Sequence, residues 1–198
     1  MRTYCLAGIV IALLVAPSPI WAQGLEPAGL CFRGRPLPWC RSFLVTELGY
    51  RYRLNEPEGV SNRTSTTWDV GWMTNRSESL ALGGTVFFGV QTSALRTVGL
   101  KPRLRRWLTG GLSVDVSAGL AFPVRDPLAS PAFSAAFTGD VGLNLSDVWQ
   151  LTGGFEIQKL AEGGTDVAWY GGGKGGSYVA LVATLLLAIA GIAYASAL

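Results

Sequence analysis

From Ser42 onward, the chain alternates apolar and polar residues with a period of two. This period is the signature of β-strands whose two faces meet different surroundings. Eight segments carry it: 42–54, 65–75, 80–91, 96–106, 110–122, 132–145, 148–159 and 165–174. Each is close to the roughly 9–11 residues that a tilted strand needs to cross a bilayer. The alternation therefore predicts an all-β domain over residues 42–174.

The links between these segments add a second regularity, because long and short links roughly alternate. Residues 55–64 and 123–131 form long links, whereas residues 76–79 and 146–147 form short ones. Outer-membrane barrels show this alternation, with short turns on the periplasmic side and longer loops outside. The link near residues 92–95 is shorter than this rule predicts.

The polar face of the segments carries a balanced set of charges. Five basic and five acidic residues share that face: Arg51, Arg53, Lys101, Arg103 and Arg105, with Glu47, Asp69, Asp115, Asp140 and Glu156. A solvent-exposed face could carry such a set by chance, but a closed lumen requires it, because buried charges must be paired. We therefore predict that these ten residues form a charge network inside a barrel.

The opposite, apolar face is rich in aromatic residues. It carries Tyr50, Tyr52, Trp68, Trp72, Trp149 and Trp169. Tryptophan and tyrosine favour the boundary between membrane and water, so we predict that these six mark the membrane interface. Only 15% of the residues are charged, whereas soluble domains carry about 25%. The aromatics could instead form the core of a soluble protein, since alternation alone does not say which face meets lipid.

With this pattern over residues 42–174, the chain resembles the small eight-stranded outer-membrane barrels of the OmpA/OmpX-like class. The resemblance rests on the pattern of strands and links and on no motif. It implies an antiparallel up-and-down transmembrane barrel with a filled interior, which serves as a membrane anchor, an adhesive surface or a structural protein. Such barrels often end in a strand with a terminal aromatic residue, and this chain departs from them by continuing into an apolar segment.

The N-terminal residues 1–23 have the features of a signal peptide. Arg2 supplies the positive start, an apolar run extends from Cys5 to Val15, and a cleavage site fits near Ala22 or Gln23. A membrane anchor is the alternative, although the run is short for a membrane span.

Residues 24–41 are rich in proline, glycine and arginine and predict an ordered lead-in to the barrel. Cys31 and Cys40 are the two cysteines that remain after the predicted cleavage, and an oxidising periplasm favours a disulfide between them. Two free thiols or half of a metal site are the alternatives.

The C-terminal segment, residues 175–198, has an uncharged apolar run over 178–198 whose length suits a transmembrane helix. It could be a helix that lies against the barrel or in the bilayer, or a distorted final strand. The glycine-rich residues 171–176 before it predict a hinge.

The chain lacks the residues that common catalytic and metal sites need. Without histidine it can form no Ser-His-Asp or Cys-His arrangement, and one cysteine pair does not complete a zinc site. Glu47 and Asp115 could act as acid and base, but paired lumen charge explains them better. The net charge of +3, without a basic run, argues against a nucleic-acid partner. We predict no enzyme, no cofactor and no metal.

These observations predict an exported outer-membrane barrel in contact with membrane lipids, with a structural, anchoring or surface-interaction role. Loops 55–64 and 123–131 would carry any contact with an extracellular partner. One alternative is a periplasmic β-domain that the C-terminal helix anchors to the inner membrane. A second is a soluble lipocalin-like barrel that binds an apolar ligand inside, and a third is a narrow channel.

Overall fold

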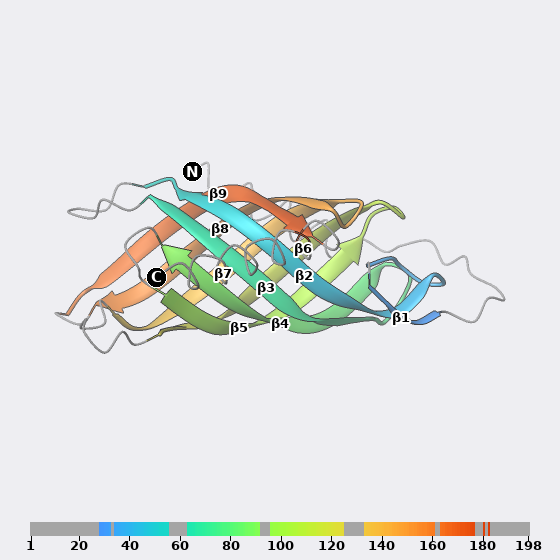
Figure 1. Ribbon diagram of the computed structural model, residues 1–198, viewed down its shortest axis with the longest axis horizontal. Helices are drawn as coiled ribbons and strands as arrows, with labels where there is room; N and C mark the ends of the chain where they lie inside the picture. Colours follow the sequence, from blue (N-terminus) through green and yellow to red (C-terminus); the bar gives the residue numbers. More distant parts are fainter. Residues whose placement is uncertain are drawn as a thin grey trace, which may run out of the picture.

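The computed structural model describes residues 28–32, 34–55, 63–91, 96–124, 133–160 and 163–176, together with 180 and 182. Within these residues the chain forms one sheet of nine strands (Figure 1). The strands are β1 (Ala28–Cys31), β2 (Cys40–Arg53), β3 (Thr64–Asn75), β4 (Leu80–Gln91), β5 (Arg96–Trp107), β6 (Leu112–Pro123), β7 (Phe133–Leu145), β8 (Trp149–Leu160) and β9 (Thr165–Gly176). The predicted signal peptide, residues 1–23, lies outside the described residues.

Strands β2 to β9 close into a barrel of eight antiparallel strands. Each strand pairs with the next along the chain, and β9 returns to pair with β2 from Glu47↔Gly176 to Arg53↔Tyr170. Closure satisfies the backbone groups that an open sheet would leave at its edges. The prediction of an all-β, closed, up-and-down barrel of eight strands is confirmed.

The strand bounds fall within two residues of those predicted from the alternation, with two corrections at the ends of the barrel. The barrel begins at Cys40 rather than residue 42, and β9 continues through residues 171–176, where a hinge was predicted. These glycines pair with β2 and β8, and the Gly176 amide donates to the Val148 carbonyl at 2.7 Å. Ladder hydrogen bonds on both sides outweigh the weak preference of glycine for strands.

Strand β1 was not predicted, because its four residues are too short to show a period. It pairs in parallel with the start of β2, in the register Ala28↔Cys40 and Cys31↔Phe43. The pairing of β9 with β2 ends at Glu47, so the edge of β2 before Glu47 is open to another strand. Figure 1 shows β1 beside β2 at the right-hand end of the barrel.

The two ends of the barrel differ in their links. The end that carries links 76–79, 108–111 and 146–148, together with β1, is named here the turn end, and the opposite end the loop end. Residues 56–62 and 125–131, which belong to the two long predicted loops, lie outside the described residues. The tightest turn, 146–148, has Ser146 and Asp147 both at φ 53°, a left-handed backbone that favours Asn, Asp and Gly in hairpin turns.

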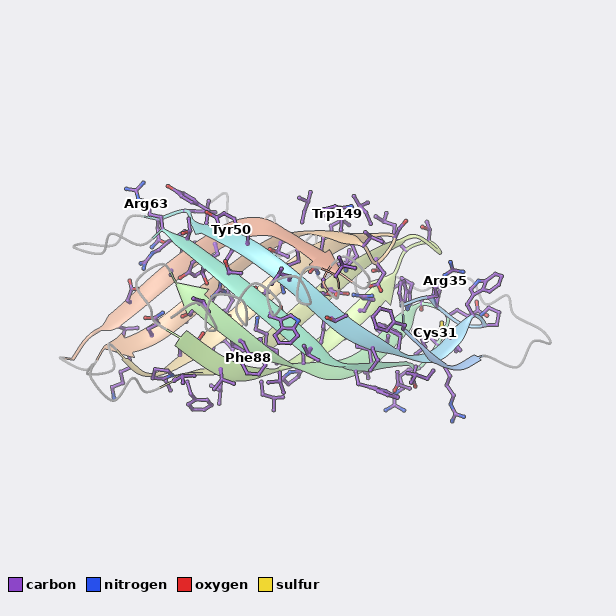
Figure 2. The ribbon with its side chains drawn as sticks, in the orientation of Figure 1. Cys31, Arg35, Tyr50, Arg63, Phe88 and Trp149 are labelled. Carbon is purple, nitrogen blue, oxygen red and sulfur yellow. A yellow bond between two sulfur atoms is a disulfide. The ribbon has the colours of Figure 1, made fainter. Side chains whose placement is uncertain are left out.

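The two faces of the strands are inverted relative to a soluble protein. Arg105 and Lys101 point inward and are 0% and 2% exposed, whereas Leu100, the residue before Lys101, points outward and is 59% exposed. In Figure 2, Tyr50, Phe88 and Trp149 likewise extend away from the barrel wall. Among the outward hydrophobic side chains of the described strands, Val114 departs from the pattern and is buried.

Apolar side chains fill the interior only near its ends. A cluster at the turn end contains Phe43, Val45, Met73, Ala81 and Trp107, and a smaller one contains Phe87, Ala121 and Ala136. Most of the rest of the described interior is polar or charged.

Of the predicted C-terminal segment, only Ala180 and Val182 follow β9 in the described residues, and both are helical. No helix among the described residues is long and apolar enough to cross a membrane.

Candidate functional site

The barrel interior gathers all ten residues of the predicted charge network. It also contains three charged residues that were not predicted, Asp147, Asp166 and Lys174. Lys174 and Asp166 occupy alternate positions of β9 whose side chains point inward, so the period of two could have identified them. The glycines of that strand weaken its alternating pattern. Asp147 lies in a turn, where strand alternation does not predict the direction of a side chain.

Arg103 is the centre of the network near the turn end. Its Nη1 and Nη2 donate to the two oxygens of Glu47 at 2.8 and 2.6 Å, and its Nε donates to Asp115 Oδ2 at 2.8 Å. The planar fork of the guanidinium matches two carboxylates at once, and a lysine could not reproduce this geometry. Arg103 thereby connects β5 to β2 across the lumen and to the neighbouring strand β6.

Arg105 extends the same cluster to the mouth of the turn end. It donates from Nε and Nη2 to Asp115 at 2.7 and 2.9 Å, and from Nη1 to Asp147 at 2.5 Å. Arg105 and Asp115 are direct partners in the β5–β6 ladder, so strand register alone brings these two together. The aromatic ring of Phe43 covers the guanidinium at 5.3 Å.

Two lysines and two aspartates form the middle of the network. Lys101 Nζ lies 2.6 Å from Asp140, and Lys174 Nζ lies 2.8 Å from Asp69. Lys101 also approaches Asp69 at 3.7 Å, and Lys174 approaches Glu47 at 3.7 Å, which joins the middle to the Arg103 cluster. The cavity here holds about 10 Å³, which is space for roughly one water molecule.

The third cluster lies toward the loop end. Arg51 Nη2 is 2.9 Å from Glu156, and the guanidinium lies 4.3 Å from the centre of the Tyr170 ring. Arg53 donates two parallel hydrogen bonds to Asp166, at 3.0 and 2.7 Å. Six cations and seven carboxylates therefore follow one another along the lumen, each in an ion pair.

This arrangement has a clear energetic meaning. A charge that loses its water must be paired and hydrogen-bonded, and removal of one partner leaves the other uncompensated. The interior therefore holds strands together, and its carboxylates and cations neutralise one another. Among the described residues, no group of three or more His, Cys, Asp or Glu could hold a metal ion.

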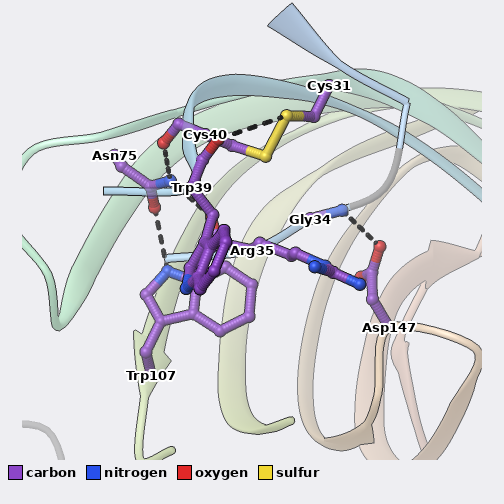
Figure 3. The surroundings of a disulfide bond; sticks show 8 residues. All are labelled: Cys31, Gly34, Arg35, Trp39, Cys40, Asn75, Trp107 and Asp147. Carbon is purple, nitrogen blue, oxygen red and sulfur yellow. Dashed lines mark hydrogen bonds between the residues drawn. A yellow bond between two sulfur atoms is a disulfide. The ribbon is translucent and has the colours of Figure 1, made fainter. Parts of the chain in front are cut away.

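The lead-in closes the turn end, where Cys31 and Cys40 are joined by a disulfide (Figure 3). The Gly34 amide donates to Asp147 Oδ2 at 2.7 Å. The Asn75 side chain donates to the carbonyls of Arg35 and Cys40, both at 2.7 Å, and accepts a hydrogen bond from the Trp107 indole at 2.8 Å. Residues 34–40 thus bind to the mouth of the barrel rather than extending away from it.

Replacement of both Cys31 and Cys40 with serine is expected to lower the free energy of unfolding by about 2–3 kcal/mol, because the bond closes a short loop in the unfolded chain. The sequence separation that sets this value is 9. Urea-induced unfolding of the oxidised protein and of the double variant measures the difference. A reductant should lower the stability of the natural chain by the same amount and leave the variant unchanged. Equal stability of the two oxidised proteins would contradict the expectation.

On the outer wall, the six predicted interface aromatics all point away from the lumen. Five of them, Tyr50, Tyr52, Trp72, Trp149 and Trp169, are exposed. Trp68 is half-buried, because its ring packs against Phe88 at 5.9 Å. Tyr50 and Tyr52 are near the loop end of β2, and Trp149 begins β8 at the turn end, so aromatic side chains occupy both ends of the wall.

The barrel is therefore closed, has eight antiparallel strands, and carries apolar side chains outside and ion pairs inside. The chain has the architecture of the small outer-membrane β-barrels. No protein-family model matches it, and no curated protein does.

Two solved structures are similar to the chain at low sequence identity. One comes from the de novo design of transmembrane β-barrels, with 14% identity, a TM-score of 0.40, and coverage of 73% of this chain and 98% of the designed one. The other is the outer membrane protein Ail of Yersinia pestis in a phospholipid bilayer nanodisc, with 10% identity, a TM-score of 0.40, and coverage of 67% of this chain and 97% of Ail.

Proposed function

We propose that the protein is an integral barrel of the outer membrane with a structural, anchoring or surface-interaction role, and that it is not an enzyme. The observation that carries the proposal is the inversion of its two faces. Arg105, Lys101 and Asp69 are almost completely buried, while Tyr50, Trp149 and Leu151 are each about 60% exposed. Only a surrounding of hydrocarbon makes this the favourable orientation of both sets.

The size of the effect supports a lipid surrounding. Burial of one large apolar side chain is worth about 1.5–3 kcal/mol, so a wall of them in water would favour association or collapse. The exposed apolar residues occur on all eight barrel strands. In a bilayer this cost disappears, and the backbone is already satisfied by the closed ladder.

The interior argues against a soluble barrel with an apolar ligand. Such a barrel needs an apolar chamber, whereas here salt bridges cross the lumen and the cavity among them holds about 10 Å³. Eight strands enclose a space just wide enough for side chains. We therefore infer a filled lumen that keeps the barrel rigid and leaves no open pore.

A periplasmic domain anchored to the inner membrane is also disfavoured, because its strands would face water. Leu100, Leu120 and Phe122 are about half exposed on neighbouring strands, which is the opposite of a solvated face. In the orientation proposed here, the turn end faces the periplasm and the loop end faces outward. Loops 55–64 and 123–131 would then present the chain to an extracellular partner.

The proposal predicts a heat-modifiable mobility on gels. Protein extracted from membranes in mild detergent and left unboiled should migrate differently from the boiled sample, because a closed barrel resists unfolding by detergent. The same protein should stay in the membrane fraction after a sodium carbonate wash and should fractionate with the outer membrane.

Two results would contradict the proposal. One is identical mobility before and after boiling, together with release by carbonate. The other is recovery in the inner membrane, which would favour the anchored periplasmic domain.

A further inference from the structure

The outer wall of the barrel is hollowed along β9. The groove encloses about 650 Å³ and its lining is mostly apolar. Tyr50 and Tyr52 of β2 form one side, and Trp149 and Leu151 of β8 form the other. Its floor is β9, whose outward-facing residues in this part are all glycine: Gly171, Gly173 and Gly175.

Two of the floor glycines, Gly171 and Gly173, are not required by close contacts within the described barrel. A Cβ at the inward Gly172 would lie 2.2 Å from the Tyr50 carbonyl oxygen, so glycine is obligatory there. At the outward positions the nearest atoms are farther away, at 3.6 Å from Gly171 and 3.5 Å from Gly173, which is ordinary contact distance. Glycine weakens a strand and often marks a site where another backbone approaches closely. Something outside the barrel therefore accounts for the floor.

The chain supplies a matching segment immediately after this strand. Residues 177–198 contain no charged residue and are rich in alanine. On a helix, small side chains would follow one another along one face of that segment as far as residue 195: Ala180, Thr184, Ala188, Gly191 and Ala195. Their spacing of three and four residues keeps them within roughly 80° of one another around the helix axis.

The two described residues of this segment agree with that face. Ala180, on the small face, is completely buried, whereas Val182, on the opposite face, is 54% exposed. The burial of these two residues thus indicates that the small face lies toward protein at Ala180.

We propose that the groove over β9 is the docking site of the chain's own C-terminal segment, which lies in it as a helix with Ala188 and Gly191 against Gly173 and Gly171. Small residues on both surfaces let two backbones approach closely, which is how helices associate in lipid. The segment begins where β9 ends at Gly176, at the turn end of the groove.

The lengths also match. A helix of about 20 residues spans roughly 30 Å, the thickness of the hydrocarbon layer. Gly173 lies about 10 Å along β9 from its end, and Ala188 lies about 12 Å along the helix from Ala180. The inference rests on the proposed function to the extent that the groove faces hydrocarbon.

Disulfide cross-linking of the full chain tests the inference. The pair Gly173→Cys and Ala188→Cys should form an intramolecular disulfide in membranes, seen as one peptide linking residues 160–174 to 175–198 after trypsin digestion. We expect at least about tenfold more of this product than with Gly84→Cys in place of Gly173→Cys, because only the docked segment has a high effective concentration at β9. Gly84 is a matched control, since it faces outward on β4, on another part of the wall, and its nearest atom is 3.4 Å from an added Cβ.

A second comparison tests the face of the helix. Ile189→Cys lies about 100° around the helix from Ala188, outside the face of small side chains, and should cross-link to Gly173→Cys far less. If the variant with Gly173→Cys and Ala188→Cys does not fold into the heat-modifiable form, the variant with Gly171→Cys and Gly191→Cys provides the same test.

Three results would overturn the inference. A disulfide between two copies would assign the groove to a second molecule, and equal cross-linking from Gly84→Cys or Ile189→Cys would show that the segment moves freely. No cross-link in folded protein would leave the groove to membrane lipid. In each case a heat-modifiable, carbonate-resistant barrel would leave the proposed function intact, whereas failure of those two tests would contradict the function.

Discussion

Replacement of Arg103 with methionine is expected to lower the free energy of unfolding by about 3–5 kcal/mol, because it leaves the buried carboxylates of Glu47 and Asp115 without their central partner. Methionine has a similar length and no charge, so loss of volume contributes little. Urea titration of protein folded into lipid vesicles, followed by tryptophan fluorescence, measures the change. The expectation rests on the hydrogen bonds that Arg103 donates to three carboxylate oxygens at 2.6–2.8 Å.

Two controls separate this effect from a general loss of arginine. Arg41→Met removes an exposed arginine at the start of β2 and should change stability by less than about 0.5 kcal/mol. Adding Glu47→Gln to Arg103→Met should recover part of the loss, because it neutralises one of the stranded charges. A loss below about 1 kcal/mol for Arg103→Met would show that water or neighbouring cations replace the arginine, and that the network is not a structural core.

The second large effect concerns the outer wall, where Leu100→Arg is expected to destabilise the barrel in lipid by about 2–4 kcal/mol. Leu100 is 59% exposed near the middle of β5. At an equally exposed site in water, the same substitution would change stability by within about 0.5 kcal/mol. The experiment therefore tests directly which solvent meets the wall, again by urea titration in vesicles.

Leu54→Arg is the matched control for position along the membrane. Leu54 is 67% exposed and follows the last residue of β2, at the loop end. An arginine near the membrane boundary should cost about 0–1 kcal/mol. Equal small losses at Leu100 and Leu54 would mean that water surrounds the barrel and would contradict the membrane proposal.

The strands themselves were predictable because side-chain alternation is a local property of an extended chain. The bounds of β4 agree with the prediction at both ends, although the polar face of that strand carries no charge. Pro102 did not interrupt β5, since the register is the same at Leu100↔Leu120 and Arg103↔Ser117 on either side of it. Strand β1 and the continuation of β9 through Gly176 were missed, because four residues or a run of glycine leave no pattern to follow.

The members of the charge network could be predicted in large part, but its pairing could not. The alternation of side chains places Glu47, Arg103 and Glu156 on the same face. It does not predict which carboxylate pairs with which cation. Arg103 and Glu47 are 56 residues apart, and Arg51 and Glu156 are 105 apart. These pairs form only when the barrel closes and β2 comes to lie beside β9.

Taken alone, the sequence determined that the chain forms eight two-faced strands and which residues share a face, since each strand residue points opposite to its neighbours. The tertiary structure decided which face looks inward, which charges neutralise one another, and how Asp147 and the disulfide-linked lead-in close the turn end. The physical reason is that the alternation of side chains between the two faces of a strand depends only on the local backbone. The direction of a face and the partner of a charge depend instead on closure and register, which join residues that are distant along the chain.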